Sequence, residues 1–486
     1  MPPPAGYLTS AAIEGVLALL NAAYPAFTQL VQTPEASVEQ RVIRALRIRG
    51  GASTGDRNGV LLVGGHHARE LINPDALVGL AYQLCWAYDN GIGITLGPTF
   101  WSANTVRSLV EGLDIFILPN VNPDGREFVR ASVQAQDQWW RKNRSVNADG
   151  TRGTDLNRNY DFLWQWIIGQ TSNVPGSETY HGSAAFSEPE TRNVRWMFDH
   201  FPNIIGYVDV HSYAELVLYP WGDDDDQNVN ATQNFLNPVW NGLRGASGGY
   251  GEYIPAADQA KFQNMGNAMR DAIAAVRGRT YTVEQGFALY GTTGISSDYA
   301  YSRFFTPGGK RKIWGFGIET NHGANQAEGF QPDYATALEV SKEIQSGLIQ
   351  FMFDCLCVVQ EVGKSLIGPE ALDALRHFRD VEMMESPRGR QWANLLDLHG
   401  REVLLLLLKD PTAWKAAGQI LSAGAAVVTG RDSASPATIG RTLVTQMQRL
   451  ATQLEKRASP PLKKALTDAR KDLGKMTGKT ARQVLR

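Results

Sequence analysis

Four short apolar runs with the composition of β-strands occur in the first two thirds of the chain. They are rich in β-branched or aromatic residues, are bounded by Gly or Pro, and span residues 60–63, 115–118, 204–210 and 313–318. Amphipathic helical patterns lie between them, for example at residues 73–88, 188–198 and 262–276. Strands that alternate with helices predict an α/β fold, in which a largely parallel sheet carries helices on both faces.

The end of the chain has a different pattern. From residue 356 onward the apolar residues recur at helical spacing, and about 21 Lys and Arg stand against about 13 Asp and Glu. We therefore predict two parts, an α/β domain over residues 1–355 and an all-α region over residues 356–486. The stretch from residue 455 is the most basic, and membrane-surface binding, nucleic-acid contact and docking to an acidic partner are possible uses. We favour a solvated face or tail, so the function and partner of this region stay unknown.

The overall composition is that of a globular protein. Of the 486 residues 43% are hydrophobic and 20% are charged, and the three cysteines are too few for a disulfide framework. The formal net charge of −2 gives no reason to expect nucleic acid as a partner. No apolar run approaches the 18 or so residues of a transmembrane helix. Because no export signal is recognisable, we expect a cytoplasmic protein, although non-classical export would leave the same sequence.

Polar residues follow each of the four strand-like runs, where ligands bind in sheets of this kind. His67 and Glu70 stand three residues apart after the first run, so both can reach one ion from a single turn of chain. Hydrolytic zinc sites use about three His and Glu ligands and leave one position for water. His211, directly after the third run, is the best candidate for the third ligand. His66 could compete with His67, but only His67 has Glu at the third position after it.

These residues, together with further motifs in the same order, resemble the zinc metallocarboxypeptidases of the pancreatic carboxypeptidase type. The resemblance runs from about residue 7 to residue 353 and rests on Gly65–Glu70, Asn122–Gly125, Trp140–Arg144, Asp155–Asn159, Ser177–Gly182, His211–Tyr213, Leu218–Gly222, and Tyr290 with Asp298. It implies a mixed, largely parallel sheet with helices on both faces and a catalytic domain over residues 1–355. It does not cover the helical region.

The resemblance also implies roles for residues at the metal. His67, Glu70 and His211 would bind one Zn²⁺ per chain. Glu319, at the end of the fourth run, would be the general base that activates water and passes the proton to the leaving amine. Arg141 would stabilise the developing oxyanion, and Asp155 would accept a hydrogen bond from His67 and fix its tautomer.

Further residues are implied to bind the substrate. Asn157 and Arg158 would hold the C-terminal carboxylate of a peptide, with Tyr290 closing over it. Arg69 and Tyr213 would line the outer subsites. Ser297 stands where basic-specific digestive members carry an acid, which favours neutral or apolar C-terminal side chains. The run Asp223–Asp226 could instead attract Lys or Arg or bind calcium. We expect a solvated acidic loop there.

The leading functional hypothesis is therefore a zinc-dependent carboxypeptidase that hydrolyses the C-terminal bond of peptides or proteins. A zinc amidase or deacylase acting on cell-wall peptides or modified amino acids is the alternative. The combination of Asn157, Arg158 and Tyr290 favours the first, because it implies a free terminal carboxylate. A non-enzymatic scaffold is a third hypothesis, disfavoured because every implied metal and catalytic residue is present.

Overall fold

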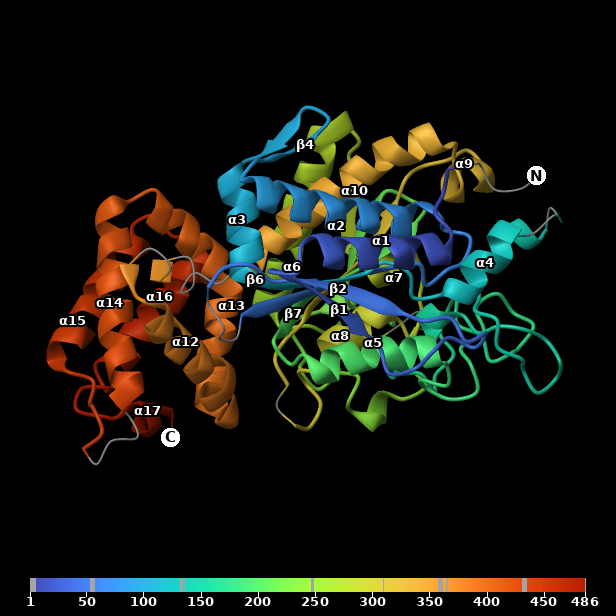
Figure 1. The fold of residues 1–486 in the computed structure, drawn as a ribbon. Helices are drawn as coiled ribbons and strands as arrows, with labels where there is room; N and C mark the ends of the chain where they lie inside the picture. Colours follow the sequence, from blue (N-terminus) through green and yellow to red (C-terminus); the bar gives the residue numbers. More distant parts are fainter. Residues whose placement is uncertain are drawn as a thin grey trace.

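A mixed eight-stranded sheet forms the centre of the computed structural model (Figure 1). The structure describes residues 6–52, 57–131, 134, 136–245, 249–308, 310–356, 362–363, 366–430 and 435–485. The strand order is β1-β2-β6-β3-β7-β12-β8-β11. The predicted fold class is confirmed, since the central strands run parallel and antiparallel pairs join β1 to β2, β2 to β6 and β12 to β8.

The four predicted strands are the adjacent central strands of this sheet. They are β6 (Leu113–Leu118), β3 (Asn58–Gly64), β7 (Ile204–Ser212) and β12 (Trp314–Thr320). The first three are buried at every position, which explains their nearly continuous apolar sequences. The outer strands are β1 (Thr28–Gln32), β2 (Arg44–Ile48), β8 (Leu216–Tyr219) and β11 (Thr282–Gln285).

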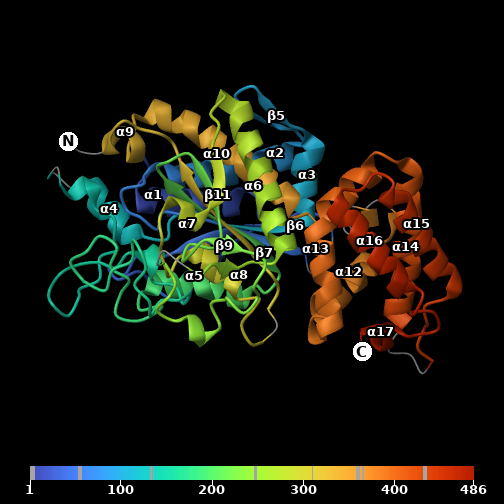
Figure 2. The same cartoon turned by 180° about the vertical axis from the view of Figure 1, so that it is seen from behind.

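Helices cover both faces of the sheet, as Figures 1 and 2 show. One face carries α1 (Ser10–Ala23), α2 (Ile72–Asn90), α6 (Ala256–Arg277) and α10 (Tyr334–Asp354). The other carries α5 (Pro189–His200) and α8 (Ser296–Ser302). Shorter elements complete the domain: α3 (Ala103–Gly112), α4 (Pro123–Ala131), α7 (Gly286–Leu289), α9 (Gln326–Phe330) and the strand pairs β4 (Ile94–Leu96) with β5 (Thr99–Trp101) and β9 (Asp226–Gln227) with β10 (Glu252–Tyr253).

The C-terminal region forms a helical lobe beside the sheet (Figure 1, orange to red). Its main helices are α12 (Pro369–His377), α13 (Pro387–Leu408), α14 (Pro411–Thr429), α15 (Arg441–Glu455), α16 (Pro460–Leu473) and α17 (Ala481–Leu485). Three of them begin with a capping residue followed by Pro, a strong start signal: Ser386, Asp410 and Ser459. A small apolar core of its own includes Leu404, Leu407 and Leu454. The boundary at residues 355–356 stays a prediction.

The lobe packs on the sheet at the amino ends of the parallel strands. Asn58, the first residue of β3, donates from Nδ2 to the backbone oxygen of Cys355 at 2.9 Å. Its Oδ1 accepts a hydrogen bond of 2.9 Å from Arg379 of the lobe. Leu398 of α13 packs against the main apolar core. The lobe therefore lies at the edge of the sheet opposite to the strand ends that carry the motifs.

No helix in the described part of the chain combines the length and the apolar character needed to cross a membrane.

Candidate active site

The candidate metal ligands come from the carboxyl ends of two neighbouring parallel strands. β3 ends at Gly64, and Gly65 then adopts a φ of +73°, a conformation that favours glycine, before His66 and His67. A Cβ at Gly65 would also lie 3.0 Å from Asn120 Oδ1. His211 is the eighth residue of the adjacent strand β7. Strand pairing thus brings together residues that are far apart in the sequence.

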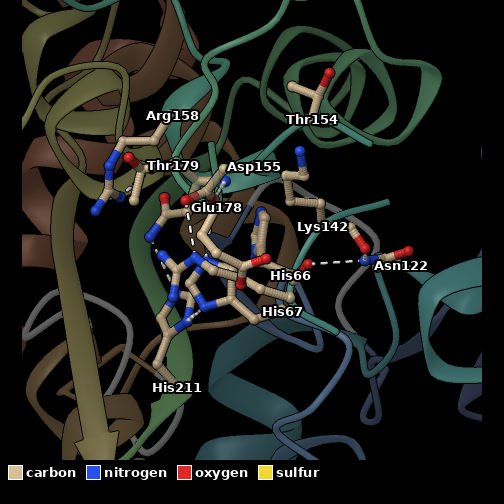
Figure 3. A network of polar contacts seen from close by, with 12 residues as sticks. His66, His67, Asn122, Lys142, Thr154, Asp155, Arg158, Glu178, Thr179 and His211 are labelled. Carbon is tan, nitrogen blue, oxygen red and sulfur yellow. Dashed lines mark hydrogen bonds and ion pairs between the residues drawn. The ribbon is translucent and has the colours of Figure 1, made fainter. Parts of the chain in front are cut away.

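His67, Glu70 and His211 form a compact buried group, as the sequence predicts. The Nδ1 atoms of His67 and His211 are 3.1 Å apart. Glu70 spans them, with Oε1 2.7 Å from His67 Nδ1 and Oε2 3.2 Å from His211 Nδ1. Figure 3 shows the two imidazole rings side by side next to Asp155. One ligand atom from each residue lies within 4.8 Å of the others.

This donor set fits a zinc ion. Ligand atoms that share a tetrahedral zinc at 2.0–2.1 Å stand about 3.3 Å apart, close to the separation of the two Nδ1 atoms. His67 Nε2 lies 3.2 Å from Asp155 Oδ1, which places the ring hydrogen on Nε2 and leaves the Nδ1 lone pair facing the group. Burial, assisted by Arg141, lowers the pKa of His67, which favours the neutral ring that a metal ligand requires. Glu70 supplies the single negative charge.

Asp155 links Arg141 to the cluster of His67, Glu70 and His211, which we call the metal group. Its second oxygen, Oδ2, accepts a hydrogen bond of 2.9 Å from Arg141 Nε. Burial opposes ionisation of Asp155, but Arg141, Arg158 and His67 together hold its pKa well below the ordinary value. Asp155 is also the N-cap of the short helix Leu156–Arg158 and accepts from the Asn157 backbone N–H at 3.0 Å. The carboxylate therefore orients a candidate ligand and a candidate oxyanion donor at once.

Glu319 lies on β12 in register with His211 on β7. Its side chain lines the same cavity as His211, Arg158 and Tyr290. Desolvation by burial raises the pKa of Glu319 to about 7, with His211 opposing the shift and the Glu70 charge adding to it. A carboxyl group with a pKa near neutrality can accept a proton and release it again.

Arg158 is a buried cation on the wall of this cavity, 2% exposed. It donates from Nε to Gln170 O at 2.8 Å and from Nη1 to Asn157 O at 2.6 Å, so about three of its five N–H donors stay available. Asp155 is close enough to interact electrostatically with Arg158. The carboxylate oxygens of Asp155, however, contact His67 and Arg141 and not Arg158. In the part of the chain that the structure describes, no carboxylate forms an ion pair with Arg158. The Tyr290 ring lies 5.7 Å from its guanidinium carbon.

Apart from Asp209, Asn157 and Tyr219, the rest of the cavity wall is small or apolar. Ser297, 9% exposed, lines it together with Leu218, Ile295 and Gly317. None of these four side chains carries a charge. The preference for neutral C-terminal side chains stays a prediction.

Two further predicted residues lie together near the metal group. The guanidinium of Arg69 stands 4.6 Å from the centre of the Phe330 ring, and Tyr213 contacts the same ring edge-on at 4.8 Å. Arg69 also pairs with the half-exposed Glu178 at 3.2 Å. Phe330 lies on the short helix α9 in a segment with no recognised motif, so the sequence alone does not indicate it.

The expectation of a solvated loop at Asp223–Asp226 is wrong for its first two residues. Asp223 and Asp224 are 0% and 4% exposed. The segment of β10 covers them, since Glu252 pairs with Asp226 and the Gly245 backbone donates to Asp224 at 2.6 Å. The residues that bury Asp223 and Asp224 lie about 20 positions later in the chain, so the local sequence does not show that these two acids are buried. The described residues of the loop bring no three carboxylates together within metal-ligand distance.

Asp209 is a functional candidate that sequence analysis did not assign. It interrupts the apolar sequence of β7, is 1% exposed, and contacts both His66 and His211. A carboxylate inside a fully buried strand, two residues before a candidate metal ligand, is the signal that could have indicated it. His66 is buried as well and does not belong to the group around Glu70.

Comparison with known proteins assigns the domain that carries these residues to a protein family. Residues 13–345 match the family model described as zinc carboxypeptidase. The chain is 34% identical over 225 residues to carboxypeptidase B of Helicoverpa zea, a match that covers 45% of this chain and 47% of the relative. It is 33% identical over 215 residues to a protein of Talaromyces marneffei named inactive metallocarboxypeptidase, covering 42% of this chain and 33% of that protein. The chain thus spans half or less of the length of these relatives.

A solved structure supports the fold. Carboxypeptidase A of Helicoverpa armigera superposes with a TM-score of 0.53 at 24% identity, over 71% of this chain and 74% of that one.

Proposed function

Since this chain belongs to the zinc carboxypeptidase family, we propose that it is an active, zinc-dependent carboxypeptidase that removes the C-terminal residue of peptides or proteins. One observation carries the proposal: the buried guanidinium of Arg158, which has no ion-pair partner among the residues that the structure describes, lines one cavity with the carboxyl of Glu319 beside His211. An anionic group is needed to balance Arg158, and the carboxylate of a peptide end is the group that places a scissile bond next to Glu319.

The substrate binds through its terminal carboxylate. Arg158 offers a planar pair of N–H donors to that group, while Asn157 and Tyr290 stand beside it. The C-terminal side chain enters the pocket at Ser297, which favours neutral or apolar residues. Arg69, Tyr213 and the ring of Phe330 support the preceding residues of the peptide.

The metal ligands, Glu319 and Arg141 together account for hydrolysis of the scissile peptide bond. His67, Glu70 and His211 would hold the Zn²⁺, which would supply Lewis acidity and lower the pKa of water. Glu319 accepts a proton as the water oxygen bonds to the scissile carbonyl carbon, then delivers it to the leaving nitrogen as the C–N bond breaks. Arg141, oriented by Asp155, donates to the carbonyl oxygen as negative charge develops on it. The products are a shortened peptide acid and a free amino acid.

The deciding experiment compares two matched peptides, one a free acid and one amidated at its C-terminus. We expect purified, zinc-loaded protein to cleave the acid far faster, because amidation removes the charge that Arg158 requires. A peptide panel varied at the last residue gives the pocket preference. Equal rates on acid and amide would favour the amidase alternative, and no hydrolysis of any peptide by zinc-loaded protein would place this chain with the relatives named inactive.

A further inference from the structure

Asp209 is a buried carboxylate on strand β7, two positions before His211. Because residues i and i+2 of a strand point to the same face, both side chains lie on one side of the sheet. Asp209 Oδ2 is 2.8 Å from Nε2 of His211, the ring nitrogen that faces away from Glu70. The second nitrogen of a candidate zinc ligand thus contacts a carboxylate.

Three donors hold this carboxylate in place. Its Oδ1 lies 2.9 Å from His66 Nδ1, and its Oδ2 accepts a hydrogen bond of 2.6 Å from Ser296 Oγ in addition to the contact with His211. The other nitrogen of His66, Nε2, is 2.7 Å from the Tyr160 hydroxyl. An ionised carboxylate can only accept hydrogen bonds, so each of its neighbours presents a hydrogen to it.

His66, Asp209 and His211 also form a second group whose ligand atoms lie within 4.8 Å of one another. A metal there would need the Nε2 lone pair of His211, whereas the group around Glu70 needs the Nδ1 lone pair. A neutral imidazole has only one such lone pair, so the two sites exclude each other. Donors crowd the Nε2 side, namely the Ser296 hydroxyl and the amide of Asn157. That side is therefore suited to hydrogen bonding and not to a cation.

Asn157 and Asp209 compete for the same ring nitrogen. Asn157 Oδ1 accepts the Ser296 backbone N–H at 2.9 Å, which turns its amino group toward His211 Nε2 at 3.2 Å. An amino group favours a bare Nε2 and therefore a hydrogen on Nδ1, where it would block metal binding. Asp209 favours the opposite tautomer, is closer at 2.8 Å, and carries a charge that strengthens the hydrogen bond.

We propose that Asp209 is a positioning residue for the metal: it keeps the hydrogen of His211 on Nε2, against the opposite preference of Asn157, and so presents the Nδ1 lone pair beside His67 and Glu70. His66 and Ser296 fix the carboxylate in the required orientation. Asp209 thus does for His211 what Asp155 does for His67. The inference rests on the zinc-dependent function proposed above.

The test uses the full chain with Asp209→Asn and Asp209→Ser. Asparagine keeps the shape of the side chain, and serine is smaller and cannot overpack the strand. The matched control is Asp258→Asn, which removes another buried carboxylate, bonded to Tyr301 and Lys312 and outside the metal group. Zinc affinity is measured by competition with a chromophoric chelator, and ligand geometry by the visible absorption of the Co²⁺-substituted protein. Circular dichroism and thermal unfolding of the metal-free proteins report the fold.

We expect both Asp209 variants to bind zinc roughly 10–100-fold more weakly than wild type, the usual effect of removing such a partner. Their Co²⁺ spectra should change as well. Asp258→Asn should leave affinity and spectrum unchanged even where its unfolding temperature falls. Wild-type zinc affinity in a folded Asp209 variant would overturn the inference, as would a second equivalent of zinc in the wild type. If neither variant folds, Asp209 is a structural residue and the inference is wrong.

These outcomes separate the inference from the function. A wild-type protein that binds no zinc or cleaves no peptide defeats the proposed function. A wild-type protein that binds zinc and cleaves peptide acids, with Asp209 variants of equal affinity, defeats only the role of Asp209.

Discussion

Glu319 and His211 occupy paired positions on the neighbouring parallel strands β12 and β7. Adjacent strands lie about 4.8 Å apart, so the ladder of backbone hydrogen bonds sets the distance between the candidate base and the candidate metal ligand. Neither residue depends on a loop for its position. The spacing of the two groups is therefore expected to be the same with and without substrate.

Replacing Glu319 with Gln should abolish most of the activity and leave the fold intact. The amide has nearly the same shape but cannot accept and release a proton, so we expect kcat to fall by about 10²–10⁴-fold or more. The measurement is steady-state hydrolysis of a peptide acid, with zinc content and circular dichroism as controls. A variant with near-normal turnover and full zinc content would show that another group is the base.

Zinc should bind with a stoichiometry of one per chain and stabilise the protein. A ligand that binds only the folded state adds about 2.7 kcal/mol at a concentration 100 times its Kd, so the unfolding temperature should rise with zinc and fall with a chelator. Glu70→Ala should lose this response together with activity. His322→Ala, which changes an exposed loop histidine, should keep both. A thermal response that survives Glu70→Ala would place the metal elsewhere.

Arg158→Lys should weaken the use of peptide acids. Lysine keeps the charge but lacks the planar fork, and a charged hydrogen bond contributes about 1.5–3 kcal/mol. We expect kcat/KM to fall by roughly 10–100-fold, since about 1.4 kcal/mol corresponds to tenfold. The comparison requires one peptide acid and equal zinc loading of both proteins. An unchanged kcat/KM would exclude Arg158 as the carboxylate site.

Stability should decrease as the pH rises from about 4 to 8, in part because of Asp298. Burial raises the pKa of Asp298 to about 8, with the charge of Glu252 adding to the shift. The folded state then binds more protons than the unfolded state between these values, so the free energy of unfolding falls as the pH increases. Asp298→Asn should reduce this fall by about 1.4 kcal/mol or more, the equivalent of one pKa unit. Denaturant titrations at several pH values test it.

The control for this prediction is Asp225→Asn, which changes an exposed acid in the neighbouring loop. Its pH profile should follow that of the wild type. If the Asp298 and Asp225 variants give the same profile as the wild type, the buried acid does not control stability in this range.

The contact between the lobe and the sheet should contribute to stability without affecting catalysis. Arg379 is 5% exposed and donates to Asn58 Oδ1, which also accepts a hydrogen bond of 3.1 Å from Arg311. Arg379→Ala therefore removes one of two buried, charged hydrogen bonds to that oxygen. We expect a loss of about 1–3 kcal/mol in the free energy of unfolding and an unchanged kcat/KM. Arg388→Ala, at a partly exposed position of the lobe, should change stability by less than about 0.5 kcal/mol. Equal effects of the two substitutions would contradict the structural role of Arg379.

Sequence patterns predicted the central strands and most of the metal group because these signals are local. A fully buried strand such as β3 has a continuous apolar sequence, and His67 with Glu70 forms one short motif beside it. The cap of α1 is local in the same way, because Thr9 accepts a hydrogen bond from the backbone N–H of Ala12, three residues further on. Such features depend on neighbours within a few residues.

Features that depend on distant segments were not predictable. The burial of Asp223 results from cover by the segment that ends in β10, and the role of Asp209 becomes visible only once His66 and Ser296 are placed around it. The docking of Arg379 on Asn58 joins residues more than 300 positions apart. Each of these contacts depends on tertiary packing, and tertiary packing between distant segments produces no recognisable pattern in the sequence.

The seven residues of β3 have different neighbours at their two ends. Asn58 meets the helical lobe, whereas Gly64 leads into the turn before His66. At about 3.3 Å per residue the strand separates these ends by roughly 20 Å. A label, a fusion partner or a solid support attached to the outer side of the lobe is therefore held behind the sheet. The lobe and the candidate active site lie at opposite ends of the strand, so immobilisation through the lobe should leave the candidate active site accessible.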